Sequence, residues 1–237
     1  MRSERLKLVT FDVDGTLTTV HGWSLIARSV HRVGEYLESQ RRFFAHEIGE
    51  DAHLKDLLEM VVGRTVPEVE RMLAATPKVE GIRATVERLR ELGIRAAILS
   101  HNPGYVCAWY AREFGFDDAE GTLGTVLGEG ARIVASGPAR ADKPGGLSRL
   151  TDRLGIEPSE TVHVGDGWAD IEVFARAGGG IAFNTRLPEV AAAADEVVQA
   201  STLTAILPAI ERLDRRGRAN DAPGAAEASN TSSRVER

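Results

Sequence analysis

The chain has 237 residues, of which 43% are hydrophobic, and its 29 basic and 35 acidic residues give a net charge of −6. This length allows one globular domain with an insertion, and the negative charge disfavours a general nucleic-acid binder. The lone cysteine, Cys107, excludes an internal disulfide. Because neither a secretory leader nor an apolar run of about 18 residues is visible, we expect a cytoplasmic protein without a membrane partner.

The N-terminal part of the chain predicts one strand followed by a helical insertion. Residues 6–11 form a short apolar-rich run that stops at the sequence Asp-Val-Asp-Gly-Thr. Residues 17–79 then change to helical periodicity, with glycines between the helices. We therefore expect a small helical cap, 17–79, inserted directly after the first strand.

Beyond residue 79 the predicted helices and strands alternate. Strands are expected at 94–100, 161–166, 180–184 and 196–198, a hairpin at 122–134, and helices at 80–92, 105–114, 143–154, 170–177, 187–194 and 203–213. This order predicts an α/β fold: a Rossmann-like three-layer parallel-sheet core formed by 1–16 and 80–213. Residues 214–237 contain only one large aliphatic residue, so we expect a disordered tail there.

Two acidic residues follow the first predicted strand, at the sheet edge where open parallel sheets bind ligands. Asp12 and Asp14 are two positions apart, so an extended chain projects both carboxylates to one side. A divalent cation relieves their repulsion, and Mg²⁺ prefers such oxygen ligands. Taken alone, the pair is equally compatible with an acidic turn that caps a helix.

Further polar residues are expected at the same edge. Asp166 ends a strand and is a third candidate ligand; Asp170, one helical turn later, either orients the metal or complements the helix dipole. Ser100 offers its hydroxyl to a phosphate oxygen, or caps the helix that follows. Lys143 is a point charge suited to phosphate, although a lysine before a helix is commonly solvated surface.

In this order, the four motifs at Asp12, Ser100, Lys143 and Asp166 resemble those of the haloacid-dehalogenase-like hydrolases, over about residues 6–210. The helical insertion and the hairpin are similar to the phosphoserine-phosphatase-like branch. The resemblance implies a phosphoric monoester hydrolase with Asp12 as nucleophile, and Asp14 as the acid that protonates the leaving oxygen and then activates water.

The resemblance also implies a cofactor and a set of binding residues. Mg²⁺ would be held by Asp12, Asp166 and the backbone carbonyl of Asp14, with Asp170 close to the metal. Ser100 and Lys143 would clamp the phosphoryl oxygens. The presence of Asp14 favours attack on phosphorus over the carbon chemistry of the dehalogenases.

Several positions depart from the phosphoserine-phosphatase pattern. His101 and Asn102 stand where glycines are usual, Trp168 and Ala169 precede Asp170, and His21 replaces an ammonium-binding glutamate. The arginine that pairs with the substrate carboxylate has no clear match. The expected substrate contacts are Gly15, Thr16, His21, Ser100, His101, Asn102, Lys143 and Trp168, with Trp23, Arg28, Lys55 and Arg64 as further cap candidates.

The sequence therefore predicts a Mg²⁺-dependent phosphatase for a small-molecule phosphate ester other than phosphoserine, acting as a monomer or homodimer. Three alternatives stay open at this point. They are a phosphoserine phosphatase, a phosphomutase that keeps the phosphate on the enzyme, and an inactive phosphatase-like binding module. Phosphate retained by the product would identify a mutase.

Overall fold

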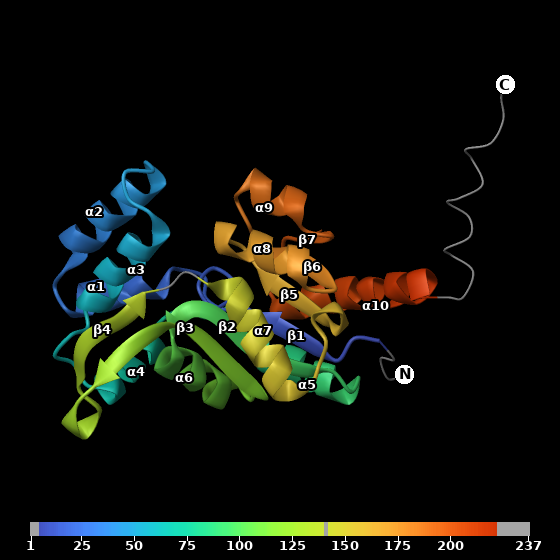
Figure 1. Ribbon diagram of the computed structural model, residues 1–237, viewed down its shortest axis with the longest axis horizontal. Coiled ribbons are helices and arrows are strands. Elements are labelled where there is room, and N and C mark those ends of the chain that lie inside the picture. Colours follow the sequence, from blue (N-terminus) through green and yellow to red (C-terminus); the bar gives the residue numbers. More distant parts are fainter. Residues whose placement is uncertain (1–4, 140–141, 222–237) are drawn as a thin grey trace.

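The computed structural model describes residues 5–139 and 142–221, and a seven-stranded sheet lies at its centre (Figure 1). The strands are β1 (Leu8–Phe11), β2 (Arg95–Pro103), β3 (Asp118–Leu127), β4 (Ile133–Ala139), β5 (Thr161–Gly165), β6 (Gly179–Phe183) and β7 (Glu196–Val198), in the order β4-β3-β2-β1-β5-β6-β7. All neighbouring strands pair in parallel except β3 and β4, which form the predicted antiparallel hairpin. The α/β prediction is confirmed.

Helices cover both faces of the sheet, which explains why its central strands are almost continuously apolar. The helices of this core are α5 (Ile82–Glu91), α6 (Gly104–Phe114), α7 (Lys143–Leu154), α8 (Trp168–Arg176), α9 (Pro188–Ala193) and α10 (Leu207–Asp221). On β2, Ala96 and Ile98 pack into the cluster that contains residues of α5 and α6. The alternate residues, Ala97 and Leu99, pack with α7 and α8 on the opposite face, which completes three layers.

Four helices lie between β1 and α5, and we call them the cap helices: α1 (Gly22–Ser29), α2 (Val33–Phe44), α3 (Glu50–Glu59) and α4 (Val66–Ala74). Figure 1 shows α1, α2 and α3 beside the end of the hairpin strand β4. The two chain segments that enter and leave the cap run side by side, since the Val79 N–H donates to the Leu17 carbonyl at 3.0 Å. The hairpin also supports the cap, because the Ile133 N–H donates to the Arg64 carbonyl at 2.8 Å.

Two expected boundaries differ from the structure. Strand β2 continues to Pro103, so His101 and Asn102 belong to the strand and not to a loop beyond it. Helix α10 continues to Asp221, so the prediction of disorder is wrong for 214–221; residues 222–237 lie outside the described residues. Asp214 is buried and accepts a hydrogen bond of 3.1 Å from the Leu6 N–H, a contact that composition does not reveal.

The structure also bears on two expectations drawn from composition. Cys107 lies in α6 as a buried free thiol. Within the two described ranges, no helix combines the length and the apolar character that a bilayer crossing requires.

Candidate active site

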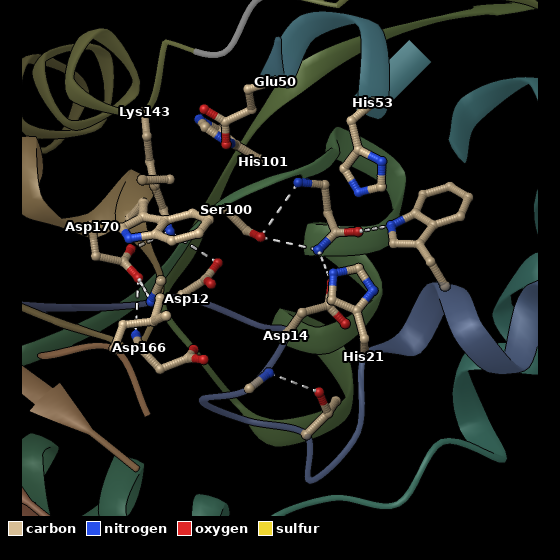
Figure 2. A pocket seen from close by; sticks show the side chains of 18 of the residues that line it. Asp12, Asp14, His21, Glu50, His53, Ser100, His101, Lys143, Asp166 and Asp170 are labelled. Carbon is tan, nitrogen blue, oxygen red and sulfur yellow. Dashed lines mark hydrogen bonds and ion pairs between the residues drawn. The ribbon is translucent and has the colours of Figure 1, made fainter. Parts of the chain in front are cut away.

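The carboxyl ends of three neighbouring strands bring the predicted motifs together (Figure 2). In β1, Phe11 pairs with Ile98 of β2 and with Val164 of β5, so the residues that follow emerge at one edge. Asp12, Ser100, Lys143 and Asp166 all line a pocket of about 700 Å³. This volume is typical of small-molecule sites.

The loop after β1 is folded tightly around the carboxylate of Asp166. Gly15 has φ +85°, and a Cβ at this position would lie 2.1 Å from Oδ2 of Asp166, so both the conformation and the space require glycine. Thr16 Oγ1 donates to Asp166 Oδ1 at 2.9 Å. Thr16 is fully buried and lies outside the pocket lining, so it supports Asp166 and the expectation of a substrate contact needs correction.

Asp12 and Asp166 form a pair of carboxylates that suits a divalent cation. Their oxygens, together with one from Asp170, all lie within 4.8 Å of one another. Burial and the neighbouring charge of Asp12 raise the pKa of Asp166 to about 8. A cation between the two carboxylates would remove this repulsion, and oxygen donors from adjacent strands match the preference of Mg²⁺.

Asp170 is less suited to bind the metal directly than the sequence suggests, because four donors already occupy its carboxylate. Oδ1 accepts from Lys143 Nζ and from His163 Nε2, at 2.5 and 2.8 Å. Oδ2 accepts from the N–H groups of Asp166 and Gly167, both at 2.9 Å. These bonds use the lone pairs that a metal would need. The geometry therefore favours a role in orienting Lys143 and the Asp166 loop.

Lys143 is fully buried and remains a cation. Its Nζ lies 3.0 Å from Oδ1 of Asp12, as well as contacting Asp170. Burial alone would lower the pKa of Lys143, but the two carboxylates outweigh burial and raise the pKa above its usual value. Lys143 thus holds the Asp12 carboxylate in place and can attract an anionic group bound beside it.

The Asp14 carboxylate lies apart from this cluster, on the His21 side of the pocket (Figure 2). Its Oδ1 accepts from the Gly22 N–H at 2.6 Å, and its Oδ2 accepts from Asn102 Nδ2 at 2.9 Å. Asn102 also donates to Ser100 Oγ, through its backbone N–H at 3.3 Å and its side chain at 3.0 Å. Because the Ser100 oxygen accepts both bonds, its O–H is available to donate into the pocket.

Three imidazoles also line the pocket, those of His21, His53 and His101 (Figure 2). His101 Nδ1 contacts Glu50 Oε1 at 3.0 Å, while His101 Nε2 and His21 Nδ1 are buried without a partner among the described residues. Glu50, the first residue of α3, is a pocket residue that sequence reasoning missed. Three cap candidates lie outside the lining: Arg28, Lys55 and Arg64.

Trp168 joins the core to the cap at the edge of the pocket. It begins α8, lines the pocket as expected, and places its ring 5.8 Å from Phe44 and 6.1 Å from Phe43 between centroids. Both phenylalanines belong to α2. The aromatic contact therefore holds the cap against the core beside the aspartates.

The chain is similar in sequence to a family of hydrolases and to known phosphatases. The family model described as haloacid dehalogenase-like hydrolase matches residues 6–178. The chain is 30% identical over 187 residues to phosphoserine phosphatase from Archaeoglobus fulgidus, covering 76% of this chain and 53% of the relative. It is also 30% identical over 192 residues to phosphoglycolate phosphatase from Halorubrum lacusprofundi, covering 72% and 81%.

A solved structure supports the fold. The substrate-bound phosphoserine phosphatase complex superposes with a TM-score of 0.74 at 23% identity, covering 87% of this chain and 99% of that chain. The chain spans about half the length of three phosphoserine phosphatases that it matches, with 53%, 46% and 49% of their sequences covered. The relatives include phosphatases named for two different substrates, phosphoserine and phosphoglycolate.

Proposed function

Because this chain belongs to the haloacid dehalogenase-like hydrolase family, we propose that it is a Mg²⁺-dependent phosphatase that hydrolyses a small-molecule phosphomonoester through an aspartyl-phosphate on Asp12. One observation carries the proposal. The Asp12 carboxylate lies beside Asp166 and 3.0 Å from the buried Lys143 ammonium, while the Asp14 carboxylate lies outside this cluster, on the His21 side of the pocket. A nucleophile and a separate acid–base group are what phosphoryl transfer to a carboxylate requires.

The proposal gives each group one step. The Asp12 carboxylate attacks phosphorus in line with the leaving oxygen, and Asp14 protonates that oxygen as its bond to phosphorus breaks. Lys143 and the Ser100 O–H stabilise the charge on the phosphoryl oxygens. Asp12 and Asp166 would hold Mg²⁺, which would supply further neutralisation of that charge when bound. Asp14, now a carboxylate, takes a proton from the water that hydrolyses the aspartyl-phosphate.

The direct test is a panel of phosphate esters assayed with and without Mg²⁺, using the wild-type chain and the Asp12→Asn variant. The proposal expects release of inorganic phosphate that requires both the cation and Asp12. A well-folded Asp12→Asn variant that keeps wild-type turnover would overturn it. Phosphate recovered on another position of the product would indicate a mutase.

We further propose that the ester carries a hydroxylated leaving group larger than serine. Among the described lining residues, the lysine and arginine side chains are Lys143 and Arg186, and both belong to the core. Lys143 is already engaged by two carboxylates. A substrate carboxylate placed against the cap would lose its hydration and find no lysine or arginine among the described cap residues of the lining, which is costly.

The unpartnered imidazole nitrogens favour hydroxyl groups instead. A buried polar atom without a partner costs about 1–3 kcal/mol, so a ligand that satisfies it gains affinity. Hydroxyls both donate and accept, and can therefore pair with His21 Nδ1 and His101 Nε2 in either tautomer. We expect kcat/KM for phosphoserine to fall at least about a hundredfold below that for the best sugar, cyclitol or nucleoside phosphate in the panel. Comparable values would refute this specificity and leave the catalytic proposal intact.

A further inference from the structure

Asn102 connects groups from two strands and from the cap. Its side chain is buried, with Nδ2 donating to Asp14 Oδ2 at 2.9 Å and to Ser100 Oγ at 3.0 Å. Its Oδ1 accepts from Trp23 Nε1 at 3.0 Å. Trp23 is buried in α1, the first of the cap helices. All the polar atoms of the Asn102 amide are therefore engaged.

Trp23 determines which way the Asn102 amide faces. An indole N–H can only donate, so it selects the orientation in which the amide oxygen faces Trp23. The reversed amide would place its oxygen against the Asp14 carboxylate and its NH₂ against the indole N–H, which gives two repulsive contacts. With Trp23 in place, the NH₂ group must face Asp14 and Ser100.

The start of α1 therefore holds Asp14 in two ways. The Gly22 N–H bonds directly to Asp14 Oδ1 at 2.6 Å, and the adjacent Trp23 acts on Oδ2 through Asn102. Two bonds to different carboxylate oxygens limit the rotation of the side chain. Precise placement of an acid relative to the leaving oxygen is a large part of its catalytic value.

We propose that Asn102 is a positioning residue that aims the Asp14 carboxyl at the leaving oxygen, and that Trp23 sets the Asn102 orientation from the cap. The inference rests on the proposed function, in which Asp14 protonates the leaving group. The sequence marked Asn102 as a substrate contact; the structure assigns it to Asp14.

The test uses a property that a structural role would not affect, the dependence of rate on the leaving group. An alkyl phosphate needs its leaving oxygen protonated, whereas 2,4-dinitrophenyl phosphate does not. The quantity to compare is kcat/KM, which reports the steps up to loss of the leaving group. For Asn102→Ala we expect kcat/KM to fall about a hundredfold on the alkyl ester, the scale of general acid catalysis, and much less on the dinitrophenyl ester.

Trp23→Phe supplies a milder variant that keeps an aromatic ring and removes only the indole N–H. It should show the same selective loss to a smaller degree. Trp109→Phe is the matched control, since Trp109 is a similarly buried indole of α6 that lies outside the pocket lining. This control should leave both esters unchanged.

The Asp14→Asn variant distinguishes a failure of the acid role of Asp14 from a failure of the positioning role of Asn102. If Asp14→Asn slows both esters equally, its role as the acid fails and the positioning role of Asn102 fails with it, while hydrolysis that still requires Asp12 and Mg²⁺ would leave the phosphatase proposal standing. If Asp14→Asn is selective but Asn102→Ala lowers both esters equally or neither, the positioning role is overturned. If Trp23→Phe behaves like Trp109→Phe, Trp23 does not set the orientation.

Discussion

Nε2 of His163 donates a hydrogen bond of 2.8 Å to Oδ1 of Asp170, the same oxygen that contacts Lys143 Nζ. Burial lowers the pKa of His163, so the ring is neutral and its single proton lies on the nitrogen that faces the carboxylate. Nδ1 then accepts from Thr10 Oγ1 at 2.8 Å, across paired positions of β1 and β5. A buried chain of contacts thus runs from the sheet to the lysine beside Asp12.

Replacing His163 with Leu should lower kcat by about tenfold to a hundredfold, the range found for partners that orient catalytic or metal-binding groups. The reason is that Asp170 loses a donor and holds Lys143 less firmly. His163→Gln, which can donate to Asp170, should recover part of the rate. The matched Thr10→Val variant should lower the melting temperature and leave kcat nearly unchanged. Wild-type kcat in a folded His163→Leu variant would contradict the orienting role.

Asp166 and Asp170 should respond differently to removal of their charge. Asp166→Asn removes an oxygen donor and should raise the Mg²⁺ concentration needed for half-maximal activity by about tenfold or more. Asp170→Asn should lower kcat with a smaller change in that concentration, because it acts through Lys143. Calorimetric titration of Mg²⁺ into both variants checks the difference. A larger loss of Mg²⁺ affinity in Asp170→Asn would show that Asp170 binds the metal after all.

Asp214→Ala should lower the melting temperature by several degrees without changing kcat. The carboxylate is buried and accepts from the Leu6 N–H, and a hydrogen bond to a charged group contributes about 1.5–3 kcal/mol. Thermal unfolding followed by circular dichroism measures the effect. Truncation after Leu213 should be at least as damaging, although composition alone predicted that removal of 214–237 would have little effect. An unchanged melting temperature in Asp214→Ala would count against the docked contact.

Glu50→Gln should raise KM for the preferred hydroxylated ester and leave KM for p-nitrophenyl phosphate nearly unchanged. Glu50 holds His101 from the cap side of the pocket. Glu47→Gln is the matched control, because Glu47 lies just before α3 and pairs with Arg41 outside the pocket. Equal KM changes for both esters would indicate a disturbance of the phosphate site and not of leaving-group recognition.

The parts of the site that could be predicted from the sequence are those that the strand ends determine. Asp12 and Asp166 directly follow β1 and β5, and Ser100 lies in β2 two positions beyond Ile98, the partner of Phe11, so all three reach one edge of the sheet. The local order of residues is therefore enough to place them together.

The remaining features depend on contacts between distant segments. Glu50 meets His101 across 51 positions of the chain, and Trp23 reaches Asn102 across 79 positions. The role of a carboxylate also depends on the groups that donate hydrogen bonds to it. From the sequence alone Asp170 is a candidate metal ligand, whereas in the structure its Oδ1 already accepts from Lys143 and His163. Neither hydrophobic periodicity nor a local sequence motif predicts these side-chain contacts.

The measurement that tests the central claim most directly is mass spectrometry of the enzyme after rapid acid quenching during turnover. The account predicts a phosphoryl group on the peptide that contains Asp12, labile to hydroxylamine as an acyl phosphate. With 2,4-dinitrophenyl phosphate as substrate it should accumulate further in Asp14→Asn, because formation then needs no acid while water is no longer activated. The group should be absent from Asp12→Asn. Phosphate release without any enzyme-bound phosphoryl group, or a phosphoryl group on another residue, would contradict the account.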